Sequence, residues 1–523
     1  MASISCLIKL LKLIILRSLR NIIRVYAHYL EPAKKNKIPE IDNELLLKPA
    51  VVIADNVRRA KITAKDVVAA YLKRIRQVDP LIKAVVDTNQ KAIQEAAEID
   101  EKVRLELEGH EPSDGVSIND MPLIGVPVSL KDLIAVKGLL ITTGIYDRRN
   151  TYASEDARLV SNLRKAGAIP IVTTNGPEML SSYDTATVLV GYTNNPYDLS
   201  RSPGGSSGGE GALIAAAASV IGVGSDVGGS IRIPGLFCGI FGHKPTSGLI
   251  SNRGLFPEIK ATIETSFVTG PMCRYASDLV PTLKCLAGDA IDKVPLIDTD
   301  VDLSKIRIFY MFQDKDLFKT QLQTELRDCV KKVVSHFEKK FGNQCIEVIF
   351  DETDIVQSYW FKTSGKQLFE EYFKYVKNKN LYLEFVKTYF GLSENTKRGI
   401  LFAMSAQCSD FRLSEEERTT VLKFRKKFDA LLGDNGVFIS PTHPEVAPKR
   451  PITLIDLPNC GYTSIHNVID APTTHCPMGL NCDGLPVGLQ VSAKAYNDHL
   501  TIAIAREIES AFNGWVPPCL INC

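Results

Sequence analysis

The most distinctive part of this sequence is a run of glycine and serine residues between Arg201 and Arg232. It contains Pro203-Gly-Gly-Ser206-Ser-Gly-Gly-Glu-Gly211 and, further along, Ser225-Asp-Val-Gly-Gly-Ser230-Ile-Arg232. Glycine costs roughly 0.5–1 kcal/mol relative to alanine inside a regular element, so a cluster of glycines favours backbone that turns tightly or approaches a ligand. The run therefore predicts a site where serine hydroxyls and backbone N–H groups converge.

A serine hydroxyl becomes a nucleophile only when a neighbouring group takes its proton. The glycine-rich run contains no histidine before His243, whereas Lys131 follows an apolar stretch, residues 123–130, that is expected to form a buried strand. Burial lowers the pKa of a lysine because it disfavours the charged ammonium, and only the neutral amine accepts a proton. This pattern therefore indicates a serine nucleophile with Lys131 as its base.

Three further residues of this region are interpreted as structural. Asp226 and Arg232 flank Ser230 and are expected to support its loop as charge partners, and His243 is expected to be a hydrogen-bonded core histidine. Neither G-x-x-x-x-G-K-[ST] nor a strand-borne G-x-G-x-x-G occurs in the sequence, so a phosphate-binding loop is not supported.

Four motifs together resemble those of the amidase signature family. They are Gly125-Val-Pro-Val-Ser-Leu-Lys131-Asp, Pro203 to Gly211 as written above, Gly224-Ser-Asp-Val-Gly-Gly-Ser230-Ile-Arg-Ile-Pro234 and Gly239-Ile-Phe-Gly-His-Lys-Pro-Thr246, with a similar stretch at residues 470–490. The resemblance covers roughly residues 45–515. It implies a Ser-cisSer-Lys triad of Ser230, Ser206 and Lys131, which stand 75 and then 24 residues apart in the order Lys131, Ser206, Ser230.

The resemblance implies a separate role for each member of this triad. Ser230 attacks an amide carbonyl and forms an acyl-enzyme, while Ser206 relays the proton to Lys131 and back to the leaving amine. The relay serine follows a cis peptide bond from the preceding residue, here Gly205. The oxyanion hole consists of four backbone N–H groups, those of Val227, Gly228, Gly229 and Ser230. Neither a metal ion nor a cofactor is implied.

Within the family, the chain looks most like the membrane-associated fatty acid amide hydrolases, particularly the second type. The similar features are the Ser-Ser-Gly-Gly-Glu-Gly continuation and the basic, hydrophobic N-terminus. This implies hydrolysis of a small apolar substrate, a long-chain fatty acid amide, with Leu180 and Ser206 in contact with it. Two other functions stay open: the A-type subunit of a mitochondrial glutamyl-tRNA amidotransferase, and a non-catalytic membrane lipid carrier.

Short apolar strands alternate with helices along the chain. Thr63-Ala-Lys-Asp66 predicts a capped helix that ends at Pro80, residues 123–130, 169–173 and 221–224 predict strands, and residues 212–220 predict a helix of small residues. This alternation favours an α/β fold with a mixed, twisted sheet covered by helices on both faces. We expect one large domain over residues 45–523, preceded by a linker over residues 31–44.

Residues 1–30 contain no acidic residue and predict a basic amphipathic helix. Five cations, Lys9, Lys12, Arg17, Arg20 and Arg24, fall within an arc of about 140° on a helix, and the remaining face is rich in Leu and Ile. A helix in the headgroup plane, with its cations against anionic lipid, fits this pattern better than a spanning helix. We therefore expect a membrane-associated protein, with a mitochondrial transit peptide and an ordinary docked helix as alternatives.

Residues 359–411 hold thirteen aromatic residues, with lysines between them. They predict amphipathic helices that either line an apolar passage or face a membrane, or else pack on the core. The sequence leaves these uses open.

Composition limits the partners and the compartment. The 62 Lys and Arg against 60 Asp and Glu give a net charge of +2, without the positive excess of a nucleic-acid-binding protein. Twelve scattered cysteines without zinc-ligand spacing indicate reduced thiols in a domain that faces the cytosol. Residues 519–523, with a cysteine at each end, are expected to form a frayed terminus. A homodimer is compatible with this composition.

Overall fold

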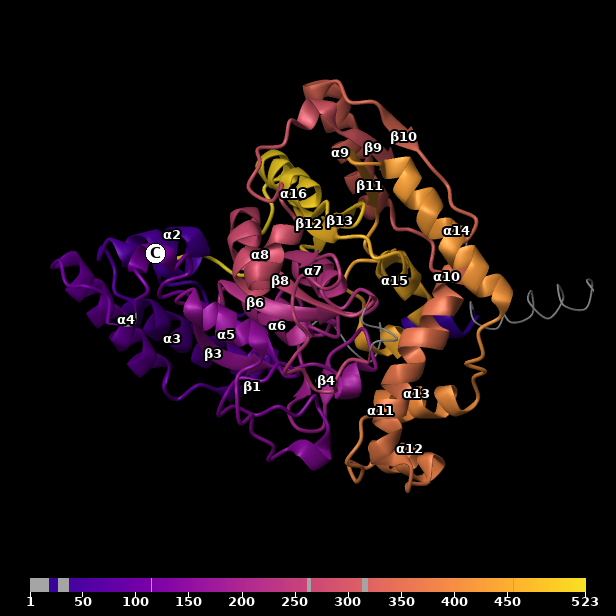
Figure 1. Cartoon of the computed structure of the whole chain (residues 1–523). Helices are drawn as coiled ribbons and strands as arrows, with labels where there is room; N and C mark the ends of the chain where they lie inside the picture. Colours follow the sequence, from indigo (N-terminus) through magenta and orange to yellow (C-terminus); the bar gives the residue numbers. More distant parts are fainter. Residues whose placement is uncertain (1–17, 27–36, 114, 261–264, 313–317, 455) are drawn as a thin grey trace, which may run out of the picture.

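Strands from most of the length of the chain form one large sheet (Figure 1). In the computed structural model, which describes residues 18–26, 37–113, 115–260, 265–312, 318–454 and 456–523, eleven strands form it in the order β1-β3-β2-β6-β8-β7-β12-β13-β11-β9-β10. The strands are β1 Val85–Thr88, β2 Pro127–Lys131, β3 Ile169–Thr174, β6 Ile221–Asp226, β7 Phe241–Lys244, β8 Val268–Cys273, β9 Arg307–Tyr310, β10 Cys345–Glu347, β11 Gly436–Ser440, β12 Thr473–Leu480 and β13 Pro486–Ala493. A separate pair consists of β4 Ala186–Thr187 and β5 Gly191–Tyr192.

The sheet is mixed and is covered on both faces. Strands β3, β2 and β6 pair in parallel, as do β11, β9 and β10, while β6-β8-β7-β12-β13-β11 pair antiparallel. Every residue of β2, β3, β6, β8, β11 and β13 is buried. Since successive side chains of a strand point to opposite faces, complete burial means that neither face is open to solvent. The predicted α/β architecture is confirmed.

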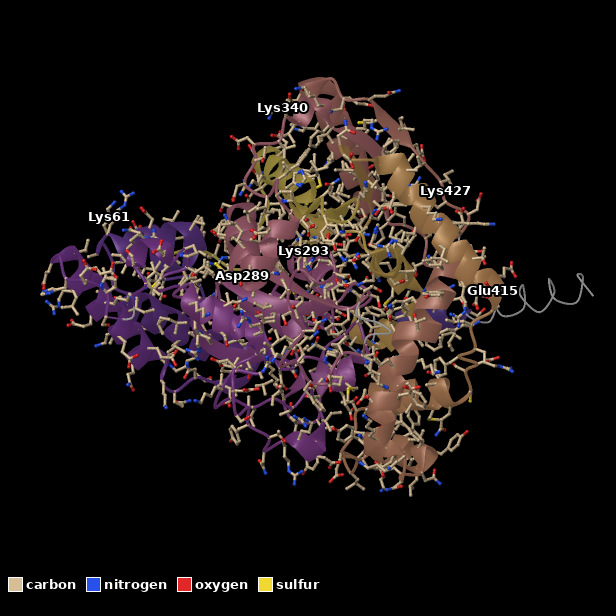
Figure 2. The ribbon with its side chains drawn as sticks, in the orientation of Figure 1. Lys61, Asp289, Lys293, Lys340, Glu415 and Lys427 are labelled. Atoms are coloured by element: carbon tan, nitrogen blue, oxygen red, sulfur yellow. The ribbon has the colours of Figure 1, made fainter. Side chains whose placement is uncertain are left out.

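The helices with defined bounds come from the whole length of the chain. They are α2 Ala50–Arg58, α3 Ala64–Ile82, α4 Ala92–Leu107, α5 Arg158–Lys165, α6 Gly208–Ala215, α7 Arg232–Cys238, α8 Leu279–Ala287, α9 Thr324–Phe341, α10 Thr353–Trp360, α11 Lys366–Val376, α12 Leu381–Tyr389, α13 Lys397–Gln407, α14 Glu415–Leu432, α15 Gly461–Val468 and α16 Asp498–Phe512. Charged residues of both signs, such as Lys61, Lys340 and Glu415, project from the outside of this assembly (Figure 2).

Two predicted helices differ from the observed ones at their ends. Helix α3 begins at its Thr63 cap as expected, with Asp66 N donating to Thr63 Oγ1 at 3.0 Å, but it continues through Pro80 to Ile82. A proline in the last turn removes a single hydrogen bond, and Lys83 N still closes the helix by donating to Asp79 O. The predicted helix 212–220 is α6, which begins at Gly208 and ends at Ala215.

The C-terminus is held in place, so the prediction of a frayed end was wrong. Ile41 N donates to Leu520 O at 2.9 Å, and Asn522 N donates back to Ile41 O at 2.9 Å. Arg74 also donates to Cys519 Sγ at 3.4 Å. Backbone hydrogen bonds to the N-terminal part of the domain therefore order residues that the sequence alone suggested were loose.

Residues 18–26 are helical and contact the folded domain through two arginines. Arg20 is buried and pairs with Asp456, and Arg24 pairs with Glu445. These arginines were expected to face lipid, but two buried carboxylates need compensating charge and bind them instead. Residues 18–26 thus pack on the domain through these two ion pairs, whereas residues 1–17 and 27–36 lie outside the described residues, and the use of the whole segment stays a prediction.

The exposed side of the same helix carries four large apolar side chains: Leu19, Ile22, Val25 and Tyr26. None of the helices in the described ranges combines the length and the apolar character that crossing a bilayer requires.

The aromatic segment forms the end of α10, a π-helical turn over Phe361–Gly365, and helices α11 to α13, on the orange side of Figure 1. Its residues divide between two environments. One set is buried with Ile145 and Met179 of the central domain: Tyr372, Val376, Leu381, Ile400 and Ala403. Another set, on and after α12, is exposed: Tyr382, Leu383, Val386, Tyr389, Phe390 and Leu392.

Candidate active site

Lys131 lies at the carboxyl end of β2 and is buried, with 1% of its surface exposed. Its Nζ donates to Ser206 Oγ at 2.6 Å and to Ser225 Oγ at 3.0 Å. Burial lowers the pKa of Lys131 to about 7, although the negative charges of Asp226 and Glu210 oppose this shift. A substantial fraction of the amine is therefore neutral near pH 7 and able to accept a proton.

Ser206 is also buried, in the turn before α6, and the peptide bond between Gly205 and Ser206 is cis. The backbone of residues 182–184 packs against this turn so closely that a Cβ on Gly205 would lie 2.9 Å from Ser182 O and from Asp184 N. The next residue connects the turn to the third site residue, because Ser207 N donates to Ser230 O at 3.1 Å. The fold thus brings together Lys131, Ser206 and Ser230 from three separate segments.

Ser230 stands in the tight loop between β6 and α7 and, unlike Lys131 and Ser206, is partly exposed. The carboxylate of Asp226 organises this loop by accepting from Gly229 N at 2.7 Å and from Ile231 N at 3.1 Å. Arg232 pairs with the same carboxylate at 3.1 Å. Burial would raise the pKa of Asp226, but Arg232 and the hydrogen bonds hold it well below its usual range, so the group stays ionised.

The four amides of residues 227–230 are not equivalent. Among the residues that the structure describes, Gly229 N donates to Asp226, whereas the amides of Val227, Gly228 and Ser230 have no acceptor. Trp360 Nε1 donates to Val227 O at 2.6 Å, and the N–H of a trans peptide points away from its C=O, so Gly228 N points away from the indole. Three backbone donors beside Ser230 thus have no acceptor in the described structure, as an oxyanion site requires.

His243 and Glu210 lie behind these groups in the core. His243 contacts Thr474 Oγ1 at 2.8 Å and Asp498 Oδ1 at 3.2 Å, consistent with a histidine that is held by hydrogen bonds. Glu210 accepts from Ser129 Oγ at 2.5 Å and from Thr174 Oγ1 at 2.7 Å. Burial raises the pKa of Glu210 to about 7, with these hydrogen bonds and Lys131 opposing the shift. No pattern in the sequence predicted that this carboxyl group is buried next to the base.

A small cavity of about 50 Å³ opens beside Ser230. It has mostly apolar walls, and Leu180, which the family resemblance places in contact with substrate, is one of them. The other side chains that form it include Tyr183, Ile233, Trp360, Phe361, Leu368, Phe402, Leu457 and Cys460. The aromatic density of residues 359–411 indicated this segment in general, but which of its rings reach the site was not predictable from spacing.

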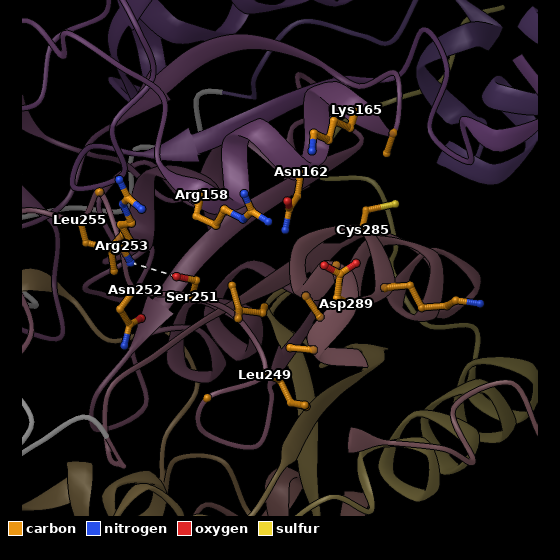
Figure 3. Close-up of a pocket in the computed structure, with 18 of the residues that line it drawn as sticks. Arg158, Asn162, Lys165, Leu249, Ser251, Asn252, Arg253, Leu255, Cys285 and Asp289 are labelled. Atoms are coloured by element: carbon orange, nitrogen blue, oxygen red, sulfur yellow. Dashed lines mark hydrogen bonds between the residues drawn. The ribbon is translucent and has the colours of Figure 1, made fainter. Parts of the chain in front are cut away.

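A larger hollow of about 1080 Å³ lies elsewhere, between α5, residues 248–259 and the end of α8 (Figure 3). Arg158, Lys165 and Arg253 are among its residues, and the close-up shows the first two rising from the same helix. None of Lys131, Ser206 and Ser230 lines it. Cavity volume alone therefore does not identify the active site. We assign the candidate site to the smaller cavity.

Comparison with known proteins shows the family to which the chain belongs. A family model described as Amidase matches residues 66–502. Fatty-acid amide hydrolase 2 of Homo sapiens is 38% identical over 93% of this chain and 93% of its own length. The A-type subunit of glutamyl-tRNA(Gln) amidotransferase from Fusobacterium nucleatum is 28% identical over 89% of this chain and 97% of its own. A solved structure of a fatty acid amide hydrolase superposes with a TM-score of 0.72 at 23% identity, covering 91% of this chain and 86% of that one.

Proposed function

Because the chain belongs to the amidase family and is a hydrolase of the fatty-acid amide hydrolase 2 type, we propose that it cleaves long-chain fatty acid amides. Ser230 is the nucleophile, Ser206 the proton relay and Lys131 the base. The observation that supports this most directly is the 2.6 Å hydrogen bond between Lys131 Nζ and Ser206 Oγ, in a turn that is bonded to Ser230.

The reaction proceeds in two halves. Ser230 Oγ bonds to the amide carbon while its proton passes to Ser206, whose own proton passes to neutral Lys131. The C–N bond then breaks, and the proton returns from Lys131 through Ser206 to the leaving nitrogen. Water attacks the acyl-enzyme by the same route and releases the free acid, so that one amide and one water give one acid and one amine.

The free amides of Val227, Gly228 and Ser230 stabilise the negative oxygen that develops on the carbonyl. One such donor contributes about 10²–10³-fold in rate in measured cases. The amide of Gly229, which the resemblance includes in the oxyanion hole, is bonded to Asp226 and so supports the loop in this structure.

Gly228→Ala is expected to lower kcat for amide hydrolysis by about 10²-fold, because the new Cβ would lie 2.6 Å from the Trp360 ring and would displace the loop amides. Steady-state kinetics checks this, with the melting temperature measured in parallel. A variant that folds as the wild type does and keeps full kcat would show that these amides do not serve the reaction.

The apolar walls of the cavity and the similarity to fatty-acid amide hydrolase 2 support a substrate that consists mainly of an acyl chain. The decisive experiment compares short aryl amides, oleamide-like primary amides and acyl ethanolamides as substrates of the full chain. Preference for the long-chain amides supports the proposal. Glutaminase activity that appears only with added partner proteins and tRNA would favour the amidotransferase alternative, and absence of turnover on every amide would favour the lipid carrier.

A membrane surface is the second partner that we propose. Apolar side chains of α12 and the loop after it are strongly exposed, with Tyr382 at 73%, Phe390 at 72% and Leu392 at 72%. Lysines accompany them, and Lys397 Nζ lies 3.7 Å from the centroid of the Tyr389 ring. Aromatic and aliphatic side chains next to cations match the interface of an anionic bilayer, as does the exposed apolar side of residues 18–26. We propose, from its scattered cysteines, that the catalytic domain faces the cytosol.

The double variant Leu383→Glu, Val386→Glu is expected to weaken binding of the full chain to phosphatidylserine-containing vesicles by about tenfold or more, because two carboxylates must then enter the lipid interface. Vesicle co-sedimentation measures the effect. Leu422→Glu, at a 63% exposed position of α14, is the matched control and should bind as the wild type does. Equal losses in both variants would contradict a specific membrane face.

A further inference from the structure

Two buried carboxylates enclose the turn that carries Leu180. Glu178 begins this turn and Asp184 follows it, and both are at most 1% exposed. The residues between them, Leu180 to Tyr183, line the cavity beside Ser230. The turn itself has an uncommon conformation, because Met179 and Leu180 both have positive φ, 47° and 58°. Non-glycine residues with positive φ persist only where the surrounding structure stabilises that conformation.

In the part of the chain that the structure describes, the carboxylate of Glu178 accepts four hydrogen bonds, all from the α11–α13 segment. Tyr372 Oη donates at 3.0 Å, Asn395 Nδ2 at 2.7 Å, Thr396 N at 2.6 Å and Thr396 Oγ1 at 2.7 Å. Gly399 allows this approach, because a Cβ there would lie 2.6 Å from Glu178 Oε2. One carboxylate therefore joins α11 and the start of α13 to the turn.

Asp184 makes the second connection. It forms an ion pair with Arg398 of α13 and accepts from Ser202 Oγ at 2.5 Å. Arg398 also donates to Arg450 O at 2.9 Å and to Thr453 Oγ1 at 2.5 Å. Ser202 lies shortly before Gly205 in the sequence. Through Asp184, Arg398 of α13 is therefore connected to the loop that carries the relay serine, Ser206.

The residues that form these contacts are one helical turn away from residues that form the cavity wall. Leu368 and Tyr372 are four apart on α11, and Phe402 and Arg398 are four apart on α13, so each pair lies on one helix face. Leu368 and Phe402 both line the cavity. The cavity of about 50 Å³ is far below the roughly 300–1,000 Å³ of typical ligand pockets, so a long acyl chain fits only when side chains of this wall move.

We propose that Glu178 and Asp184 are positioning residues that hold the α11–α13 wall over the acyl pocket and thereby determine which acyl chain lengths the enzyme accepts. This inference rests on the proposed function. A short acyl group reaches Ser230 without displacing Leu368 or Phe402, whereas a long chain depends on where these two side chains stand. Loss of a contact should therefore change selectivity between substrates more than it changes the chemistry common to all of them.

The test measures kcat/KM for a series of amides with one amine and acyl groups from two to eighteen carbons, on the full chain. For Glu178→Gln, which replaces one acceptor oxygen by an NH₂ facing donors, we expect the ratio of long-chain to short-chain kcat/KM to fall at least tenfold. Short-chain hydrolysis and fluorophosphonate labelling of Ser230 should change less than about twofold. Glu371→Gln, on α11 but outside these contacts with Glu178 and Asp184, should keep the wild-type ratio.

Tyr372→Phe removes one donor from the other side of the same contact and should shift the ratio in the same direction by a smaller factor. If Glu178→Gln does not fold, the selectivity ratio of Tyr372→Phe is the test of the inference. A uniform loss across all chain lengths, or an unchanged ratio in a folded variant, overturns the inference. Wild-type protein that fails to label at Ser230 would instead refute the proposed function, which keeps the two failures distinct.

Discussion

Ser230→Ala is expected to lower amide hydrolysis by at least about 10³-fold and to abolish labelling by a serine-directed fluorophosphonate. The substitution removes the only atom that forms the acyl bond in the proposed reaction, and loss of a serine nucleophile costs up to about 10⁶-fold in measured hydrolases. The fold should survive, because Ser230 contributes a backbone carbonyl to Ser207 N that alanine also supplies. Intact-mass measurement after labelling, together with kinetics, checks both effects.

The matched control is Ser251→Ala, in the larger hollow of Figure 3. Ser251 Oγ accepts from Arg253 N and contacts none of the proposed triad. This variant should label and turn over as the wild type does. Labelling that survives Ser230→Ala unchanged would move the nucleophile to another residue and end the assignment.

The pH dependence of the reaction should follow the proton on Lys131. Because the pKa of Lys131 is lowered to about 7, kcat/KM is expected to rise nearly tenfold per pH unit below pH 7 and to level off above it. Lys131→Ala should lose at least about 10²-fold at pH 8 and should no longer show this rise. A pH profile that stays the same in Lys131→Ala would assign the titration to another group.

The same lysine affects stability with a defined sign. Its pKa is near 10.4 in the unfolded chain and lower in the folded one, so the unfolded state binds more protons between about pH 7 and pH 10. Stability linked to this group is therefore fully present above the unfolded pKa and declines as the pH falls toward 7. Lys131→Met should accordingly raise the melting temperature at pH 7 while it abolishes the base, which separates the effect on folding from the effect on activity.

The sequence predicted the central features of the site because they are local. The motifs around Lys131, Ser206 and Ser230 are short, and their glycines and serines can be recognised directly in the sequence. Placement of α6 was less accurate, since the helix was predicted over residues 212–220 and instead begins at Gly208. At Gly208 and Gly209 the neighbouring Thr185 and Asn175 leave no room for a Cβ. Glycine marks close packing as well as turns, and spacing does not distinguish them.

The walls and supports of the site were not predictable, because they depend on contacts between distant segments. Trp360 reaches Val227 across more than a hundred residues, and Glu178 meets Thr396 across more than two hundred. Arg20 illustrates the same limit, since an amphipathic pattern gives the angle of a cation on its helix but not the buried carboxylate, Asp456, that it will find.

Trp360 also has a practical use that follows from where its indole stands. The chain has two tryptophans, and Trp515 is enclosed in the core, 8% exposed, with its indole donating to Ala215 O at 3.2 Å. Trp360, by contrast, borders the cavity and donates to the loop next to the nucleophile. Intrinsic fluorescence therefore contains a reporter at the site and a reference away from it, so that stopped-flow emission can follow acyl-enzyme formation and decay without an added dye.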